Sequence, residues 1–510
     1  MRIETVGEPE AQRQTNGLDG TDTQDSEMCH ELETTDNVID ELDADELALS
    51  APASSGVVAE EESLTGQEVS NIRRDIFALA LPALAEMSLM TLVSMADMIM
   101  VGRLGPWAIT SVGLSNQPMF VAMSVFMALN VGATALVARA TGAKRPEEAS
   151  AVARQALMIA SGLGVVLSIL GFIYATPIIS WMGAEADVMG PGTSYLRIVA
   201  VGLLFQGSTM SLTASLRGAG DTKTPMSVNM VANVVNVVGN YLLINGHFGF
   251  PRLGVAGAAV ATTISRIVAF VLIIRKLLLD KGAIKMSVHD SFRPDPVIIQ
   301  RIFRIGLPAA IEQVVMRSGQ MTFARIVSSF GTATYAAHQV ALNVEGFSFT
   351  PGQAFQIAAT SLVGQSLGAK KPKRAIRTGW EAVKIGIAIA VTVGLVYFFF
   401  GKYVVLLYTD DLEVTQLATG ALRIIAVAQP FMLSNFIISG SLRGAGDTRW
   451  TLYITMAGVW GVRVALAYLL AIRLNMGLYG AWIAMAMDMA TRAVLLALRF
   501  RAGHWTKIEV

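Results

Sequence analysis

SLRGAGDT occupies residues 215–222, and the same eight letters return at residues 441–448, 226 positions later. An identity of this length at a fixed offset indicates an internal repeat. Two copies of one structural unit therefore make up most of the chain, which in an apolar protein is typical of transporters. The same offset pairs LPA at 81–83 with 307–309, Glu86 with Glu312, and GAK at 142–144 with 368–370.

The chain is too apolar for a soluble protein of its size. Of its 510 residues, 53% are hydrophobic and 15% are charged, and the mean hydropathy is +0.52. Twelve apolar stretches are long enough to cross a hydrocarbon core of about 30 Å as helices. We therefore expect an all-α polytopic membrane protein with twelve transmembrane helices in two pseudo-symmetric six-helix bundles. The stretches lie near 76–101, 114–138, 152–180, 193–216, 225–246, 254–279, 301–328, 338–364, 376–405, 416–442, 450–472 and 478–500.

Charge divides the chain into segments. Residues 1–70 hold 19 of the 39 acidic residues but only two basic ones, and they are poor in aromatic side chains. Such a segment cannot bury enough apolar surface to fold alone, so we expect a disordered acidic tail. The first bundle should span 71–280, and the second should span 301–510 with a short C-terminal tail. The polar residues 281–300 should connect them.

Basic residues mark one side of the membrane. They gather in alternate loops, and loops rich in Lys and Arg stay in the cytoplasm. Each half has an even number of spans, so both halves enter from the same side and the repeats are parallel. Both termini should then be cytoplasmic, in a protein of the plasma (inner) membrane. The basic segments are 73–74, 144–145, 275–304, 370–377 and 499–507.

Two carboxylates lie inside the first span. Glu86 and Asp97 are 11 residues apart, close to three helical turns, so they share one helix face. A carboxylate among apolar groups can bind and release a proton near neutral pH, because burial disfavours its charged form. Pro82 gives the helix a place to bend, and Met87 and Met90 offer a flexible wall. The alternatives are an interfacial acid at Asp97 and ordinary apolar filling by the methionines.

Four asparagines form a stripe along the fifth span. Asn229, Asn233, Asn236 and Asn240 follow one another at steps of 4, 3 and 4 residues. They can line a cation site or join helices by hydrogen bonds. The repeat-equivalent positions near 455–466 carry no asparagine. Scaffold features should be duplicated and a single ion site need not be, so we favour the ion site.

The second half carries buried charges of both signs. Glu312 and Glu345 can pair with Arg317 or Arg463, and such pairs either hold helices together or contact substrate. Two further polar side chains, Asn130 and Gln356, are repeat mates in the second and eighth spans. The substrate cavity that we predict is lined by Glu86, Met87, Met90, Asn130, Asn233, Glu312, Glu345 and Gln356.

Motifs of enzymes and ATPases are missing from the sequence. It contains no Gly-x-x-x-x-Gly-Lys-Ser/Thr for nucleotide phosphates and no His-Glu-x-x-His or clustered Cys for a metal. We expect a protein that is not an enzyme, needs no cofactor, binds no nucleic acid and takes its energy from an ion gradient.

These features together resemble the multidrug and toxic compound extrusion (MATE) family. The resemblance covers about 71–500 and rests on six plus six spans, Leu-Pro opening each half, and Ala-Asp followed by Val-Gly at the end of the first span. Gly-Ala-Lys after the second and eighth spans and the paired Leu-Arg-Gly-Ala-Gly-Asp-Thr complete it.

The resemblance implies a V-shaped pair of bundles that alternates between outward and inward openings. It implies export of cationic, amphipathic compounds against proton or sodium entry, by a protein that functions as a monomer in the lipid bilayer. It also implies a coupling site at Asp97, with sodium as one possible ion there. Members of the family with a purely acidic site carry an Asp where this chain has Asn240, which leaves Asp97 as the lone anion of the site. The implied partners of Asp97 are Gln206, Asn236, Asn240 and Thr262.

Two other classes of function stay open. A flippase for lipid-linked precursors belongs to the same broader superfamily, but it should have a strongly basic cavity for pyrophosphate. A gated channel or receptor would allow transport without ion-driven accumulation.

Overall fold

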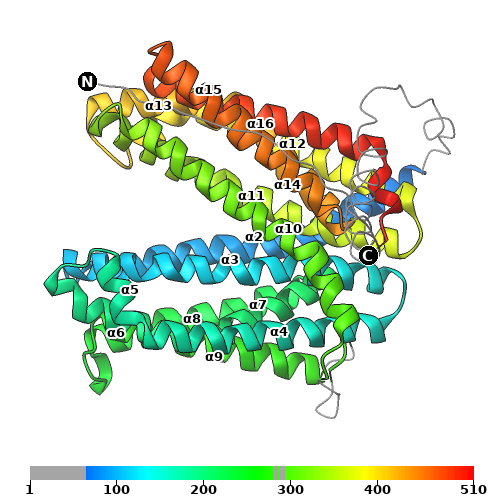
Figure 1. Ribbon diagram of the computed structural model, residues 1–510, viewed down its shortest axis with the longest axis horizontal. Coiled ribbons are helices and arrows are strands. Elements are labelled where there is room, and N and C mark those ends of the chain that lie inside the picture. Colours follow the sequence, from blue (N-terminus) through cyan, green and yellow to red (C-terminus); the bar gives the residue numbers. More distant parts are fainter. Residues whose placement is uncertain (1–64, 280–281, 283, 287–292, 510) are drawn as a thin grey trace, which may run out of the picture. The chain divides into compact units, whose positions relative to one another are not determined.

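The computed structural model describes residues 65–279, 282, 284–286 and 293–509, and its regular elements there are all helices. Figure 1 shows the first half in blue to green and the second half in green through yellow to red. Most of the expected acidic tail and part of the connector lie outside these residues. Residues 66–70 belong to the first helix, which begins at a capping box formed by Thr65 and Glu68.

The first half contains six membrane-crossing segments, as the sequence predicts. Two of them are broken: α5 follows α4 after Tyr174, and α6 meets α7 at Gly202 with a bend of 44°. The elements are α2 (Gly66–Gly102), α3 (Pro106–Gly142), α4 (Pro146–Ile173), α5 (Ala175–Trp181), α6 (Ala186–Val201), α7 (Leu203–Gly218), α8 (Lys223–Asn245), η1 (His247–Gly249) and α9 (Val255–Leu279).

The second half repeats this order. Its eleventh span changes from α-helix to π-helix and back, which is a wider winding often found at functional sites. The elements are α10 (Pro296–Ser328), α11 (Thr332–Gly368), α12 (Pro372–Val405), α13 (Leu412–Gly444), α14 (Thr448–Met456), η2 (Ala457–Val464), α15 (Ala465–Ala467), η3 (Tyr468–Arg473), α16 (Gly477–Ala502) and η4 (His504–Lys507).

The expected all-α fold of two six-helix halves is confirmed. Nine helices in the described ranges are long and apolar enough to cross a membrane, or ten when α6 and α7 count as one bent span. The helices α10 and α11, which carry the charged residues Glu312, Arg317 and Glu345, complete the twelve.

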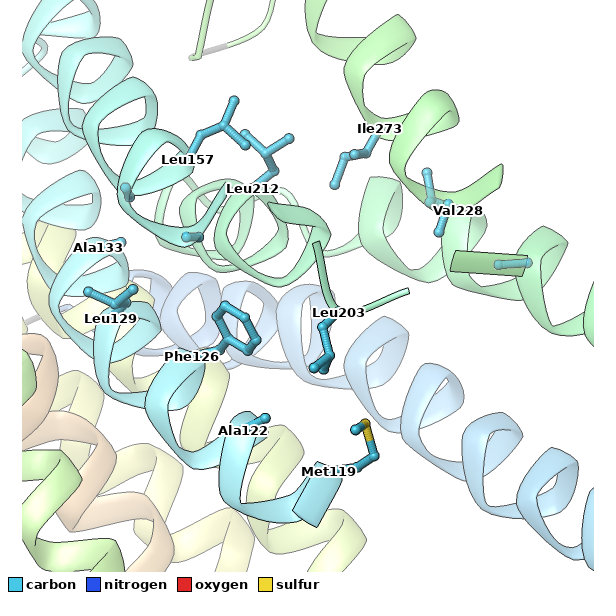
Figure 2. Packing of buried hydrophobic residues seen from close by; sticks show 14 of the residues in the cluster. Met119, Ala122, Phe126, Leu129, Ala133, Leu157, Leu203, Leu212, Val228 and Ile273 are labelled. Carbon is cyan, nitrogen blue, oxygen red and sulfur yellow. The ribbon is translucent and has the colours of Figure 1, made fainter. Parts of the chain in front are cut away.

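The core of the first half forms along one face of α3. Met119, Ala122, Phe126, Leu129 and Ala133 recur at helical spacing and are all buried. Figure 2 shows them near Leu203 and Leu212 of α7 and Leu157 of α4, while Val228 of α8 and Ile273 of α9 lie farther from α3 in the same cluster. This packing holds the helices of the site in fixed positions.

The two halves meet through their first and second helices. α2 contacts α11, and its repeat mate α10 contacts α3. A Cβ at Gly142 would clash with the backbone of Gln365, and a Cβ at Gly368 would clash with the backbone of Arg139. Each contact is the repeat equivalent of the other, so a pseudo-two-fold axis passes between them.

Polar contacts between the halves gather at the end of the helices that carries the basic loops. At this end, the Ser361 hydroxyl of the second half donates to the Arg217 carbonyl of the first half. This contact and four others hold the two halves together on the side that carries the basic loops. The contacts are Arg73–Glu381 at 2.8 Å, Arg374–Asp75 at 3.1 Å, Arg139 Nη2 to Ala445 O at 2.7 Å and Gln365 Nε2 to Gly218 O at 2.9 Å.

Candidate functional site

Asp97 lies little more than one turn before the end of α2, where its carboxylate meets α8. Asn240 donates from Nδ2 to Asp97 Oδ1 at 2.5 Å. The hydrogen-bond network orients the Asn236 amide so that its nitrogen donates to Asp97 Oδ1 at 2.9 Å and Oδ2 at 3.1 Å. Its oxygen then accepts from Thr262 Oγ1 of α9 at 3.3 Å. Four of the five residues expected at the coupling site therefore form one connected group.

The hydrogen bonds of this group favour an ionised carboxylate. Two amide nitrogens donate to Asp97, and hydrogen bonds to the charged form stabilise it. The side-chain carbonyl oxygen of Asn240 is buried and accepts no hydrogen bond from any residue that the structure describes. Carboxylate, carbonyl and hydroxyl oxygens are the ligands that hard cations prefer. The residues present thus fit a sodium ion held among these oxygens, and a proton that binds Asp97 has to compete with the two donated hydrogen bonds.

The fifth expected residue, Gln206, is separate from this hydrogen-bonded group. It lies on the first turn of α7 after the bend at Gly202, and its side chain makes no hydrogen bond to Asp97 or to the two amides in the described part of the chain. A residue that the sequence did not single out, Tyr195 of α6, is buried and interacts electrostatically with both Asp97 and Arg266. The only signal for Tyr195 in the sequence was a polar aromatic side chain inside the fourth span.

Glu86, the second carboxylate inside the first membrane span, is occupied by an ion pair. Arg217 of the repeated motif lies 2.7 Å from Glu86 Oε1, and Asn229 Nδ2 donates to the same oxygen at 2.6 Å. The Glu86 side chain is only 2% exposed. The asparagine stripe of α8 therefore binds both acids that lie inside the first span, with Asn229 at Glu86 and the other end of the stripe at Asp97.

The second half repeats the ion pair at Glu312. Arg443 lies 2.9 Å from Glu312 Oε2, and Thr455, the repeat mate of Asn229, donates to Oε1 at 2.9 Å. The prediction that Glu312 pairs with Arg317 or Arg463 was wrong. The arginine of the repeated turn, which enters from the membrane surface, reaches the acid instead. Since both copies of the motif make this contact, we expect the pair to hold helices together in each half.

The remaining residues of the expected cavity are dispersed over α2, α3, α8 and α11. Asn233 is half-buried on α8 between Asn229 and Asn236, and its buried Nδ2 has no hydrogen-bond partner among the described residues. Gln356 donates to Ser439 at 3.3 Å within the second half. Met87 and Asn130 are half-buried, and Met90 is 49% exposed.

Glu345 is the most deeply buried acid of the expected cavity. It is 1% exposed on α11, and its Oε1 has no hydrogen-bond partner within the described ranges. Arg463 of η2 interacts with it electrostatically without forming an ion-pair contact in the described part of the chain. Arg463 instead pairs with Asp488 of α16 at 2.7 Å, and Arg492 pairs with the same acid at 2.7 Å. Gly458 leaves room for this triad, because a Cβ there would clash with Asp488.

The acids do not assemble into a multidentate metal site. Within the described ranges, no three His, Cys, Asp or Glu side chains lie close enough together to hold a metal ion. A cation at Asp97 would therefore depend on neutral oxygen ligands beside the one carboxylate.

Known proteins match this arrangement over most of the chain. A family model described as MatE matches residues 82–242 and 308–469, one copy in each half. A "Probable multidrug resistance protein NorM" of Thermotoga maritima is 34% identical over 456 residues, which is 88% of this chain and 96% of the relative. A solved structure described as "Crystal structure of MATE in the bent conformation" is similar with a TM-score of 0.78 and 25% identity, over 86% of this chain and 99% of the other. One described as "in the straight conformation" has a TM-score of 0.78 and 26% identity over the same shares.

Proposed function

Because the chain belongs to the MatE family, we propose that it is an antiporter that exports cationic, amphipathic compounds in exchange for protons or sodium. The coarser function follows from the family: the chain is a multi-pass membrane transporter of the multidrug and toxic compound extrusion type. Resistance to drugs is named for the Thermotoga maritima relative and not for this chain.

The single observation that carries the proposed coupling is the half-buried Asp97 held by two amides. Its neighbours donate hydrogen bonds to the ionised form, so uptake of a proton or a sodium ion must rearrange them. Intramembrane acids of this kind mark ion paths. Asp97 thus links the charge state of one carboxylate to the contact between α2 and α8.

The proposed cycle uses the bend that proline permits in α2. Pro82 lies inside α2 and has no backbone N–H, so the carbonyl one turn earlier lacks its helical partner. Loading Asp97 with an ion weakens its hold on Asn236 and Asn240, and α2 then bends and narrows the space beside Met87 and Met90. Similar proteins solved in bent and in straight conformations support two stable states of this fold.

The proposed substrate wall lies between the two ends of the asparagine stripe. Met90 and Asn233 lie between the Glu86 contact and the Asp97 contact, and Met87 lies beside Glu86. Asn130, Gln356 and Glu345 remain part of the proposed path, whereas the carboxylates of Glu86 and Glu312 are already paired with arginines. A cationic substrate would leave when Asp97 binds the coupling ion, because one anion cannot balance two cations.

The proposed orientation puts the basic loops and both termini in the cytoplasm of the plasma membrane. Hydrogen bonds join the two halves at the end that carries the basic loops, so the described conformation would be closed toward the cytoplasm. We further propose that one chain acts alone, since each half supplies its own set of polar residues.

Ethidium efflux from cells that lack other pumps tests the proposal. De-energised cells are loaded with the dye and given an inward gradient of protons or of sodium, each alone. Efflux above that of cells without the protein under one of the gradients supports antiport and identifies the ion. Equal efflux with and without either gradient would refute ion coupling.

A further inference from the structure

A groove of about 830 Å³ lies between α2, α8 and α9 at the basic end of the first half. Its size is within the range of sites that hold small ligands. Its basic members are Lys223 at the start of α8 and Arg275 and Lys276 near the end of α9. No acidic side chain is among the described residues that line it.

The groove changes from basic to apolar along its length. Lys223 and Arg275 are exposed at the basic end. The walls continue with Pro82, Val231 and Leu272, and Val231 lies about 12 Å further along α8, from eight residues at 1.5 Å each. Val231 is 46% exposed, so the apolar end is open at the protein surface. This order of charge and apolar surface matches a phospholipid standing in one leaflet.

The charges do not belong to a helix-terminus site. In the first turn of α8, Thr224 N already donates to Asp221 Oδ1 at 2.9 Å, and Pro225 has no amide hydrogen. An anion in the groove would therefore be bound by the side chains. Basic pockets between transmembrane helices on the cytoplasmic side attract anionic lipid headgroups, which are concentrated in that leaflet.

We propose that this groove binds an anionic phospholipid of the cytoplasmic leaflet, with its phosphate at Lys223 and Arg275 and an acyl chain along Val231 and Leu272. Lys276 lies beside the phosphate position. Pro82 is part of the wall, so the bound lipid contacts the segment of α2 that bends in the cycle proposed above. Lipid binding itself does not require that cycle.

Native mass spectrometry of the purified full-length protein tests this site. The protein is incubated with phosphatidylglycerol or with phosphatidylcholine, and the retained lipid is counted. The double variant Lys223→Gln, Arg275→Gln removes both charges. Arg449→Gln, Arg501→Gln makes the same change in charge on exposed residues of the second half, where Arg449 is the repeat mate of Lys223. Lys223→Arg, Arg275→Lys keeps both charges.

Wild type should retain phosphatidylglycerol in preference to phosphatidylcholine, and the Gln variant of the groove should bind it about thirtyfold more weakly. Each basic group near an anionic lipid surface contributes about a factor of five. The charge-preserving variant and the second-half variant should bind as wild type does. Inorganic phosphate at the same concentration should not displace the lipid, because it has no acyl chain. Equal retention by wild type and the groove variant, or no preference for the anionic lipid, would overturn the proposal. Displacement by phosphate alone would also overturn it.

Discussion

Replacing Glu86 by glutamine tests whether the repeated ion pairs are scaffold. The change keeps the shape of the side chain and leaves Arg217 without its anion. Glu86 is 2% exposed and Arg217 is 20% exposed, so most of the pair is shielded from water. Removing one partner of a buried pair costs about 3–5 kcal/mol, and the partial exposure of Arg217 puts the expected loss near the lower end, about 3 kcal/mol.

The repeat supplies an internal comparison. Glu312→Gln leaves Arg443, which is 15% exposed, in the same position, so it should cost a similar amount. Glu185 is an exposed acid, and Glu185→Gln should change stability by less than about 0.5 kcal/mol. The measurement is the fraction of purified protein that stays monodisperse after heating. Both pair variants should lose this fraction at clearly lower temperatures than wild type and the control.

Transport measured on the same variants separates a scaffold role from a substrate role. Protein that survives purification should still export ethidium under the driving gradient, because the pair lies apart from Asp97. Unchanged thermal stability together with abolished transport in Glu86→Gln would refute the scaffold assignment and return Glu86 to the substrate cavity.

Three further predictions concern the site, the axis and the orientation. Asn240→Leu should lower ion-driven efflux at least tenfold while the amount of folded protein stays normal. The reason is that a hydrogen bond to a charged group contributes about 1.5–3 kcal/mol. Normal efflux would contradict a role of Asn240 in ion coupling. Gly142→Val and Gly368→Val should each destabilise the protein by about 1–3 kcal/mol in heating assays, since both meet backbone of the other half. Gly162→Val adds a side chain in open space and should leave the stability unchanged. Equal losses of stability in all three variants would disprove the close approach of the two halves at Gly142 and Gly368. Cys29, the only cysteine, should react with a membrane-impermeant maleimide in inverted vesicles and not in intact cells; the reverse would place the N-terminus outside.

Much of the fold could be predicted because the repeat and the apolar stretches are independent signals. Helix α8 begins at Lys223 and ends at Asn245, within two residues of the stretch near 225–246. The bend at Gly202 and the π-helical winding near Arg463 had no such signal, because both depend on packing against neighbouring helices.

The site was predictable where polar residues share one helix face. The spacing of Asp97 from Glu86 matches that of Asn240 from Asn229, so two parallel helices bring both pairs into contact. Partner choice in the second half was not predictable, because it depends on where long side chains reach. Arg443 lies in the last turn of α13, and its guanidinium extends back into the bundle to Glu312.

Ethidium efflux by Asp97→Asn tests the central claim most directly. The amide removes the titratable anion with little change in volume, and Asp187→Asn makes the same substitution at an exposed acid. Under whichever gradient drives the wild type, the account predicts that Asp97→Asn shows no gradient-dependent efflux while Asp187→Asn matches wild type. Gradient-driven efflux by Asp97→Asn at the wild-type rate would contradict it and would move the coupling site to Glu345.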